Sequence, residues 1–256
     1  MPKINAFKQA LKDKQQLGLF STLGSPNLAE LLAGCGYDWI LIDTEHSPND
    51  MQEIVSQLQA MSSFDVQTIV RPAWSDMIMV KRCLDAGAQT LLFPCVQNAA
   101  EAELAVSYTR YPPLGVRGVS GSTRAASYGL DTKYFQSAEE QICVLVQIET
   151  KEALDKLEEI AAVEGVDAVF IGPTDLAASM GHIGNTQHPE VQAAVDDAFR
   201  RLRALGKPTG YLTLNEAEAT RRIAEGVDFI AVATDTSIIT RGATALLQRL
   251  APVHAA

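Results

Sequence analysis

Short apolar runs recur along the whole chain and are separated by segments with helical spacing. The apolar runs occupy residues 17–22, 38–43, 67–71, 90–93, 143–148, 167–171, 208–212 and 228–232. Each run is nearly continuous in hydrophobicity, which is typical of strands that are buried on both faces of a parallel sheet. The segments with helical spacing occupy residues 50–60, 76–86, 99–109, 151–161, 188–205 and 215–225. This alternation predicts eight strands with helices between them.

Several of the expected helices carry start signals. Asn98 precedes AAEAE, Asn27 precedes LAELLA, and Pro189 stands at a plausible first turn after His188. Residues 1–16 contain no apolar core region, so we expect them to form an ordinary first helix rather than a signal peptide.

Eight strand–helix units within 256 residues match a (β/α)8 barrel of the TIM type. The competing arrangement is a doubly wound open sheet, which would show fewer strands and a glycine-rich first turn. The first turn, TLGSPN at residues 22–27, lacks the G-x-G-x-x-G pattern. No linker interrupts the chain, so the sequence predicts a single α/β barrel domain over residues 1–256. The longest irregular segment, residues 111–140, is expected to be functional or to form a lid.

Composition and charge narrow the range of partners. The chain is 47% hydrophobic and 20% charged, which is typical of a globular protein, and it has no apolar run of about 18 residues that could span a membrane. A net charge of −10 without a basic block argues against nucleic acid or an anionic membrane as partner. Any anionic substrate must therefore be bound by locally placed cations.

The four cysteines show no CxxC pair. They are Cys35, Cys83, Cys95 and Cys143, and all but Cys95 stand among apolar residues. This pattern indicates buried free thiols in a reducing compartment rather than disulfides or a zinc site, and it predicts a cytoplasmic protein.

Ionisable and polar residues follow the expected strands at their carboxyl ends, where a barrel places its chemistry. They are Asp43, Glu45 and His46 after the second strand, Arg71 after the third, Gln147 and Glu149 after the fifth, Gly172 to Asp175 after the sixth, and Tyr211 and Leu212 at the seventh. Each has a structural alternative, since Asp43, Glu149 and Asp175 could cap helices or turns, His46 could lie in a surface loop, and Arg71 could form a structural ion pair. Five strand ends with such groups at one mouth favour a functional site.

The residue types suggest a specific chemistry. Glu149 and Asp175, with Gln147 alongside, would make an all-oxygen site that suits a hard divalent ion such as Mg²⁺ or Mn²⁺. Zinc would prefer histidine or cysteine ligands. A 2-oxo acid chelated by such an ion has an acidified C–H next to its ketone. Arg71 could then stabilise the enolate oxygen, and His46 could move the proton. Asp43 could orient that histidine.

Five segments together resemble a known family. They are ILIDTEHSPN (40–49), IVRPAW (69–74), YPPLGVRGV (111–119), VLVQIET (144–150) and VDAVFIGPTDLAASMG (166–181). They are similar to the class II pyruvate aldolases of the HpcH/HpaI type, which include hydroxy-oxo-heptanedioate and dehydro-deoxy-sugar-acid aldolases. The resemblance covers about residues 5–250 and implies a barrel of the phosphoenolpyruvate/pyruvate type.

The resemblance also implies catalytic roles. Glu149 and Asp175 match metal ligands, with Mg²⁺, Mn²⁺ or Co²⁺ usable. His46 matches the catalytic base, acting directly or through a metal-bound water, and Arg71 matches the residue on the keto or enolate oxygen. Asp43 resembles the acid paired with the histidine. Asp85, which lies at the end of an expected helix, resembles an acid that raises the basicity of that histidine and can come from a neighbouring subunit.

The expected substrate-binding residues share the carboxyl ends of strands five to seven. They are Gln147, Gly172, Pro173, Thr174, Asp175 and Leu212. Members of the family assemble as hexamers built from two trimers, often with the C-terminal helix exchanged. Thr44, where glycine is common, and the loop SGSTRAASYG at 120–129 depart from the family pattern, so the resemblance defines the pyruvate half of the site but not the aldehyde acceptor.

The expected reaction is a reversible, metal-dependent cleavage of a 4-hydroxy-2-oxo acid into pyruvate, or hydroxypyruvate, and an aldehyde. A Schiff-base aldolase would need a lysine at the mouth, yet Lys207 precedes the seventh strand and Lys151 lies beyond Glu149. A CoA-ester lyase of the citramalyl- or malyl-CoA type could use Arg117 and Arg124 to bind phosphates. A non-catalytic barrel that binds an oxoacid is the third alternative.

Overall fold

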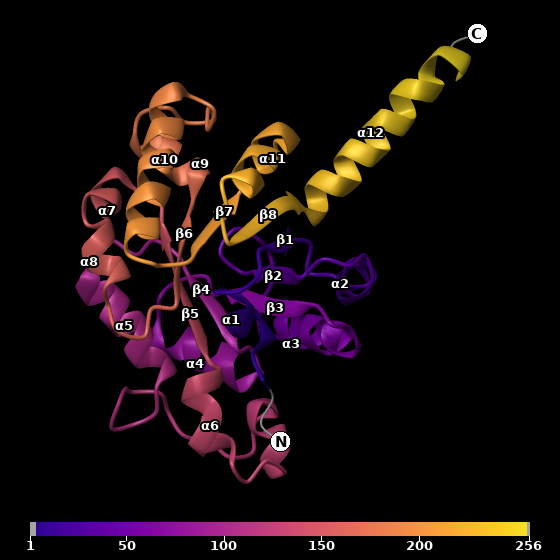
Figure 1. Cartoon of the computed structure of the whole chain (residues 1–256). Helices are drawn as coiled ribbons and strands as arrows, with labels where there is room; N and C mark the ends of the chain where they lie inside the picture. The colour runs from indigo at the N-terminus through magenta and orange to yellow at the C-terminus, as the bar shows by residue number, and fades with distance from the viewer. Residues whose placement is uncertain (1–3, 255–256) are drawn as a thin grey trace.

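The computed structural model describes residues 4–254, and its eight parallel strands close into one barrel in chain order (Figure 1). The strands are β1 (Gln16–Ser21), β2 (Trp39–Asp43), β3 (Gln67–Arg71), β4 (Thr90–Phe93), β5 (Cys143–Ile148), β6 (Ala168–Ile171), β7 (Thr209–Leu212) and β8 (Phe229–Thr234). The predicted (β/α)8 barrel is confirmed, and each expected strand agrees with an observed one to within two residues. The open-sheet alternative is wrong because β1 pairs with β8.

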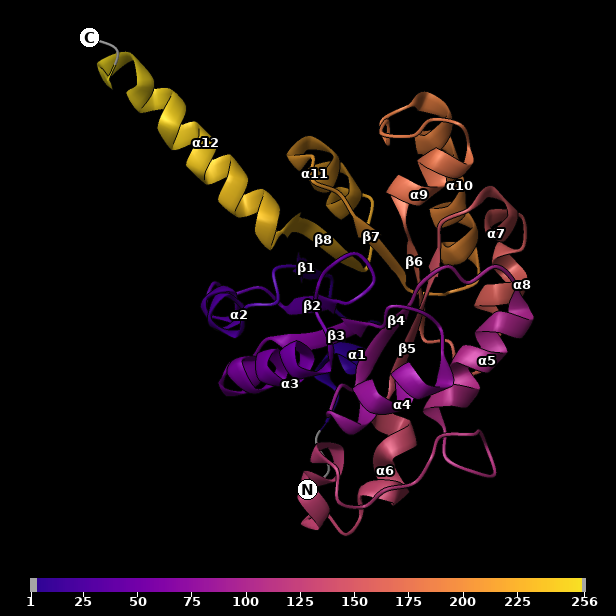
Figure 2. The ribbon, with the colours of Figure 1, turned by 180° about the vertical axis from the view of Figure 1, so that it is seen from behind.

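Helices surround the strands (Figure 2). They are α1 (Ala6–Ala10), α2 (Pro26–Ala33), α3 (Met51–Ala60), α4 (Met77–Asp85), α5 (Ala99–Thr109), α6 (Tyr134–Gln141), α7 (Lys151–Asp155), α8 (Leu157–Ala161), α9 (Pro173–Ser179), α10 (Pro189–Ala204), α11 (Glu216–Ala224) and α12 (Asp235–His254). Asn98 and His188 cap α5 and α10, as the start signals indicated. The predicted start of α2 at Asn27 is wrong, because the side chain of Ser25 accepts the capping hydrogen bond from the Leu28 N–H at 3.3 Å.

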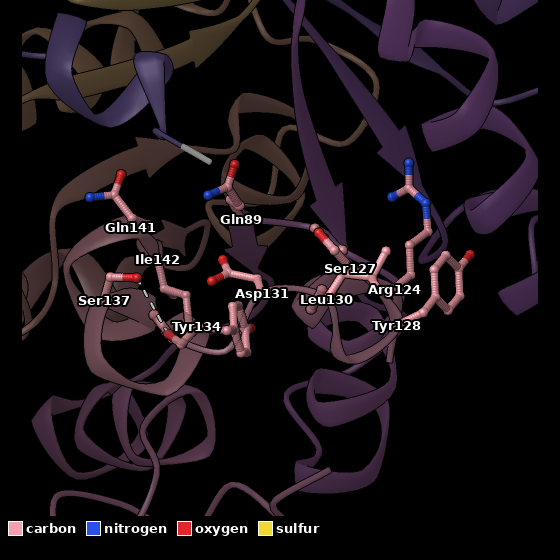
Figure 3. A pocket seen from close by; sticks show the side chains of 14 residues that line it. Gln89, Arg124, Ser127, Tyr128, Leu130, Asp131, Tyr134, Ser137, Gln141 and Ile142 are labelled. Atoms are coloured by element: carbon pink, nitrogen blue, oxygen red, sulfur yellow. Dashed lines mark hydrogen bonds between the residues drawn. The ribbon is translucent and has the colours of Figure 1, made fainter. Parts of the chain in front are cut away.

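The segment expected to be irregular, residues 111–140, contains a 3₁₀ helix, η2 (Arg124–Gly129), and part of α6. It lies at the amino end of β4 and β5, where it borders a cavity of about 370 Å³ (Figure 3). None of the described residues in segment 111–140 lines the cavity at the carboxyl ends of the strands. Within one chain, this segment is therefore not a lid over that end of the barrel.

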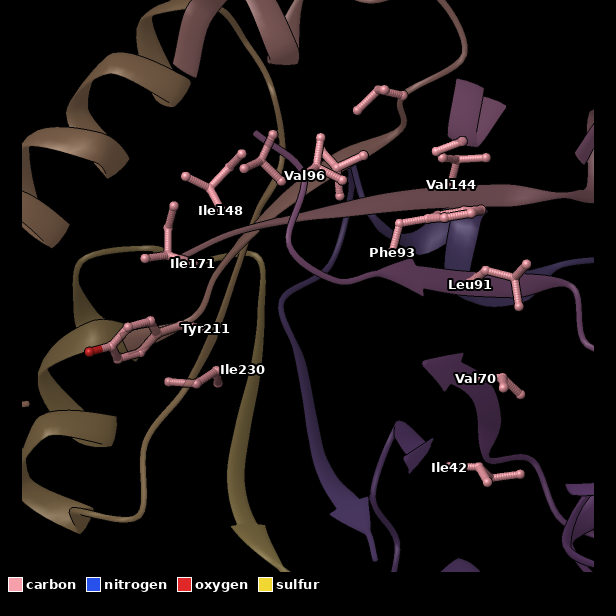
Figure 4. Close-up of a cluster of buried hydrophobic side chains, with 14 of the residues drawn as sticks. Ile42, Val70, Leu91, Phe93, Val96, Val144, Ile148, Ile171, Tyr211 and Ile230 are labelled. Atoms are coloured by element: carbon pink, nitrogen blue, oxygen red, sulfur yellow. The ribbon is translucent and has the colours of Figure 1, made fainter. Parts of the chain in front are cut away.

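The hydrophobic core has two layers, as alternation along buried strands requires. The outer core fills the space between strands and helices and includes Ile42, Val70, Leu91, Val144 and Ile171 (Figure 4). The inner core fills the barrel itself with Phe7, Leu11, Phe20, Trp39, Leu41, Ile69, Leu92, Cys143, Leu145, Ala168, Phe170, Phe229 and Ala231. Phe7 of α1 packs edge-on against Phe229 at 5.4 Å between ring centroids, so α1 closes the amino end of the barrel.

Two further expectations concern the surface. Cys35 is exposed, so the expectation that it is buried is wrong, whereas Cys83 and Cys143 are buried. Within residues 4–254, none of the helices combines the length and apolar character that crossing a bilayer requires.

Helix α12 extends away from the barrel in both views (Figures 1 and 2), and its exchange between subunits stays a prediction.

Gly210 of β7 tests the inner core. A Cβ at this position would lie 2.3 Å from Phe229 Cζ and 2.6 Å from Phe170 Cδ2, both within well-packed rings. We expect Gly210→Ala to lower the free energy of unfolding by about 1–3 kcal/mol, measured by urea denaturation. Gly121→Ala is the matched control, because its Cβ would stand 3.8 Å from Phe135. Equal stability of the two variants would contradict the packing described here.

Candidate active site

The alternation of side chains along the strands decides which residues reach the carboxyl end of the barrel. The inner core contains Leu41 of β2, Ile69 of β3 and Leu145 of β5. The next inward positions are Asp43, Arg71 and Gln147, and Glu149 continues the row beyond β5. All four side chains are buried, and Asp43 and Arg71 stand opposite each other in the register of β2 and β3. The interior therefore changes from apolar to polar or charged within one step along these three strands.

Arg71 is the central cation of this end of the barrel. Its Nε donates to Asp43 Oδ1 at 2.8 Å, and its Nη1 lies 2.9 Å from Glu45 Oε2 and 3.5 Å from Gln147 Oε1. The guanidinium also lies 5.2 Å from the ring centroid of Phe20. Burial alone would lower the pKa of Arg71, but the hydrogen bond to Asp43 and the nearby carboxylates raise it on balance. Arg71 therefore stays charged and is held in one orientation.

Glu149 is held by neighbours on three sides. Its Oε1 accepts a hydrogen bond from the Cys95 N–H at 2.8 Å, and its Oε2 accepts one from the Gln147 amide. A Cβ at Gly172 would lie 2.7 Å from Glu149 Oε2, so only glycine leaves room for this carboxylate. Cys95 has a positive φ of 55°, which is unfavourable for a residue with a side chain. In this backbone conformation the Cys95 N–H is directed at Glu149 Oε1.

The carboxylates around Glu149 suit a hard divalent cation. Glu45, Cys95 and Glu149 each offer a ligand atom within 4.8 Å of the others. Burial raises the pKa of Glu45, and the charge of Glu149 adds to this shift, whereas Arg71 lowers the pKa. The carboxylates of Glu45 and Glu149 therefore lie close enough to repel each other. Burial and the adjacent Glu149 raise the pKa of Cys95 to about 12, which keeps its thiol protonated. The carboxylate oxygens are thus the ligands on offer, and they fit an oxygen-preferring ion.

A cavity of about 310 Å³, here called the mouth cavity, opens above these groups. It is lined by Phe20, His46, Arg71, Gln147, Glu149, Phe170, Gly172, Pro173, Thr174, Asp175 and Leu212. Its buried floor holds Arg71, Gln147 and Glu149, whereas Thr174 and Asp175 at the start of α9 are exposed. His46 stands on the rim with 63% of its side chain exposed, and its Nε2 lies 3.8 Å from Glu45 Oε1. The cavity therefore combines a fixed cation, carboxylates and a solvent-accessible imidazole.

The arginines of residues 111–140 serve the structure at the opposite end of the barrel. Arg117 is fully buried and donates through Nη2 to Asp85 Oδ1 at 2.9 Å and to Tyr134 Oη at 3.1 Å. Arg124, beside the cavity of Figure 3, donates to the backbone carbonyls of Ala86 and Leu58. Neither lines the mouth cavity, so these observations do not support a CoA-phosphate role for them in this chain.

Comparison with known proteins decides the family. The HpcH/HpaI aldolase/citrate lyase family model matches residues 16–241. This chain belongs to that family. It is 53% identical over 249 residues to a pyruvate aldolase of Rhizobium etli, which covers 97% of this chain and 98% of that protein. It is also 53% identical over 247 residues to a 4-hydroxy-2-oxo-heptane-1,7-dioate aldolase of Klebsiella pneumoniae, covering 96% and 93%.

A solved structure of the HpcH/HpaI aldolase/citrate lyase family gives the same result for the fold. A Burkholderia cenocepacia protein described as a member of this family superposes with a TM-score of 0.94 at 40% identity. The match covers 96% of this chain and 99% of the other. The resemblance inferred from the sequence motifs is therefore confirmed at the level of family and fold.

The structure brings nine of the expected site residues of this HpcH/HpaI family member to the mouth cavity. They are His46, Arg71, Gln147, Glu149, Gly172, Pro173, Thr174, Asp175 and Leu212. Their individual roles stay predictions, because proximity alone assigns no function. Asp175 borders the cavity but does not belong to the group of ligand atoms around Glu149.

Two expected residues, Asp43 and Asp85, do not line the mouth cavity. The resemblance implies that Asp43 pairs with His46, whereas the structure places its carboxylate on Arg71 Nε and on the Glu45 N–H at 3.1 Å. Asp85 ends α4 and pairs with Arg117, outside the residues that line the mouth cavity. A role for Asp85 beside His46 would therefore require a second copy of the chain.

Sequence reasoning listed Glu45 without giving it a role, and it did not select Cys95 for the site. Glu45 lies between Asp43 and His46 in the sequence, so its position was a signal that the assignment of roles overlooked. Cys95 gave no such signal, because it contributes a backbone N–H whose direction depends on the connection between β4 and α5. The unusual Thr44 also has a structural role, since its hydroxyl donates to the Arg71 carbonyl at 2.7 Å.

Gly172→Ala tests the packing around Glu149. The new Cβ would stand only 2.7 Å from Glu149 Oε2, so the carboxylate would have to move. We therefore expect the affinity for Mn²⁺ to fall at least about tenfold. Titration calorimetry of the metal-free protein measures this affinity. Gly121→Ala serves as a control far from the mouth cavity. An unchanged Mn²⁺ affinity in Gly172→Ala would show that Glu149 does not depend on this contact.

The thiols provide a test of the electrostatics. At pH 8 the Cys95 thiol, with a pKa of about 12, remains protonated, and burial likewise raises the pKa values of Cys83 and Cys143. In metal-free native protein, Ellman's reagent should therefore react rapidly with Cys35 alone. Cys35→Ala should remove the fast phase, and Cys95→Ala should preserve it. A fast thiol that survives in Cys35→Ala would contradict the raised pKa of Cys95.

Proposed function

We propose that this protein is a class II pyruvate aldolase. It reversibly cleaves 4-hydroxy-2-oxo acids to pyruvate, or hydroxypyruvate, and an aldehyde. The observation that carries the proposal is the mouth cavity, where Arg71, the held carboxylate of Glu149 and the exposed imidazole of His46 converge. The names of the Rhizobium and Klebsiella relatives, at 53% identity over nearly the whole chain, support the same reaction class.

Glu149 and Asp175 are the proposed ligands of a divalent cation, with Mg²⁺, Mn²⁺ and Co²⁺ as candidates. When bound, such an ion supplies a Lewis acid that polarises the ketone of a 2-oxo acid. Gln147 and the Cys95 N–H keep Glu149 in place for this purpose.

The first turn of α9 is the proposed site for the substrate carboxylate. Pro173 stands at its start, no side chain caps its N-terminal N–H groups, and Thr174 and Asp175 line the cavity. Free N–H groups at a helix start attract anions, so those of Thr174 and Asp175 are suitable donors. Leu212 and Pro173 provide apolar wall on the same side of the cavity.

His46 is the proposed base. In the cleavage direction it takes the proton of the C4 hydroxyl, the C3–C4 bond breaks, and the electron pair becomes the enolate of pyruvate. Arg71 donates to the enolate oxygen, which at an oxyanion-type site stabilises the transition state by about 3 kcal/mol. A proton returned to C3 then gives pyruvate, and in the synthetic direction the same base removes a methyl proton. The Glu45 carboxylate lies 3.8 Å from the ring that receives this proton.

Assembly and localisation belong to the same proposal. Helix α12 extends from the barrel and exposes Ile239, Leu246, Leu247 and Leu250. We propose that these side chains are covered by a second copy in a hexamer of two trimers, with α12 exchanged and Asp85 of one subunit near His46 of another. The four free cysteines support a reducing, cytoplasmic location.

The rival mechanisms lack support at the mouth cavity. None of the lysines among residues 4–254 lines it, which disfavours a Schiff-base aldolase. The buried ion pair of Arg117 and the backbone contacts of Arg124 disfavour CoA-phosphate binding by these side chains.

Exchange of the pyruvate methyl protons with D₂O tests the proposal without knowledge of the aldehyde. With Mg²⁺ present, wild-type protein should exchange them, and His46→Ala should be slower by about 10²–10⁴-fold because the base is absent. Arg71→Lys should be slower by about 10²–10³-fold. Proton NMR measures both rates, and His188→Asn is a matched histidine variant that should keep the wild-type rate.

Three outcomes would contradict parts of the proposal. A near wild-type exchange rate in His46→Ala would show that His46 is not the base. Full activity after exhaustive chelation would show that the reaction needs no divalent cation. Pyruvate and Mg²⁺ binding without any exchange would indicate a non-catalytic oxoacid-binding barrel. A panel of aldehydes with pyruvate then identifies the acceptor.

A further inference from the structure

A second group of metal-ligating side chains lies outside the mouth cavity. His182 belongs to the connection between α9 and α10, His188 caps α10, and Glu190 stands in its first turn. Each offers a ligand atom within 4.8 Å of the other two. The two histidines are half-buried and Glu190 is exposed, so the group is accessible from solvent.

The two imidazoles and the carboxylate are already close together. His182 and His188 stack with 3.5 Å between ring centroids and 14° between ring planes. His182 Nε2 lies 2.9 Å from Glu190 Oε2.

The backbone of the connection holds this arrangement in place. The His182 N–H donates to the Ala177 carbonyl at 2.7 Å, and the Asn185 N–H donates back to the His182 carbonyl at 2.9 Å. The His188 N–H then donates to the Asn185 carbonyl at 3.1 Å. Gly181, with a φ of 85°, makes the turn that starts the connection.

Ordinary structural roles account for only part of the group. His188 Nδ1 accepts the Glu190 N–H at 3.3 Å, which is a capping contact that asparagine or serine also makes. The pair of His182 with Glu190 is a surface interaction that contributes little to stability. Neither role requires a second imidazole stacked on the first.

We propose that His182, His188 and Glu190 bind one divalent transition-metal ion of the Zn²⁺ class. Two imidazoles and one carboxylate are a common set of protein ligands for zinc, with water as the fourth. This set differs from the carboxylate group of the mouth, since imidazole suits zinc and carboxylate oxygens suit Mg²⁺ or Mn²⁺. The ion would replace the hydrogen bond between His182 and Glu190. The two rings would turn out of their stack, because an imidazole binds a metal in the plane of its ring.

Occupancy of this site would also brace α9. The helix begins with Pro173, Thr174 and Asp175 at the mouth cavity and ends at Ser179, three residues before His182. An ion that joins His182 to the start of α10 therefore restrains the carboxyl end of α9. Its binding needs no aldolase chemistry, so its test is independent of the proposed function.

Zinc titration of the metal-free full-length protein tests the inference. Glu149→Gln is the background, because it weakens metal binding at the mouth. Calorimetry in this background should show one Zn²⁺ per chain, and adding His182→Ala or His188→Asn should weaken it at least about 100-fold. His188→Asn keeps a capping side chain, so loss of Zn²⁺ in this variant reflects the imidazole and not the fold. Adding His46→Ala to the same background should leave Zn²⁺ binding unchanged.

Two further readouts keep the outcome decisive. Co²⁺ in place of Zn²⁺ should give visible absorption of tetrahedral intensity that His182→Ala abolishes, and Zn²⁺ should raise the melting temperature only when both histidines are present. Mg²⁺-supported exchange should be the same in His182→Ala and in wild type, because His182 does not line the mouth cavity. The inference is overturned if the Glu149→Gln protein binds no Zn²⁺, or if both histidine variants bind it with unchanged affinity.

Discussion

A closed parallel barrel directs alternate side chains of every strand into one narrow space. The inner core fills this space with rings such as Trp39, Phe170 and Phe229, and glycine at 210 is needed to admit them. At the carboxyl ends the same inward rows meet water, and there the side chains become Asp43, Arg71 and their neighbours. Core packing and site geometry are therefore two consequences of a single alternation.

Charge balance at the mouth follows from this crowding. Asp43 and Glu45 form ion pairs with Arg71, and the charge of Glu149 also acts on it. Among the residues that line the mouth cavity, Arg71 is the one lysine or arginine. The shortage of positive charge agrees with the overall net charge of −10. A 2-oxo acid adds a further negative charge, so a bound divalent cation would balance both the protein's carboxylates and the substrate. Burial is the main reason that the pKa of Glu45 is raised, and the charge of the neighbouring Glu149 adds to the shift.

Helix α9 connects the mouth cavity with the proposed zinc site. Its first turn carries Thr174 and Asp175, and its end leads within a few residues to His182. The two ligand sets differ in hardness, with carboxylate oxygens at one end and imidazole nitrogens at the other. Two different ions could therefore occupy one chain without competing for the same ligands.

The sequence by itself determined the eight strands, the barrel and most residues of the mouth cavity. Local hydrophobic patterns define buried strands, and in a barrel every strand end lies at the same mouth, so His46, Arg71, Glu149 and Asp175 could be grouped without coordinates. Only the tertiary structure decided the partners. It placed Asp43 on Arg71, directed the Cys95 N–H to Glu149 and stacked His182 on His188. These contacts depend on strand register, on the positive φ of Cys95 and on the turns between α9 and α10, and none of these can be read from hydrophobic patterns.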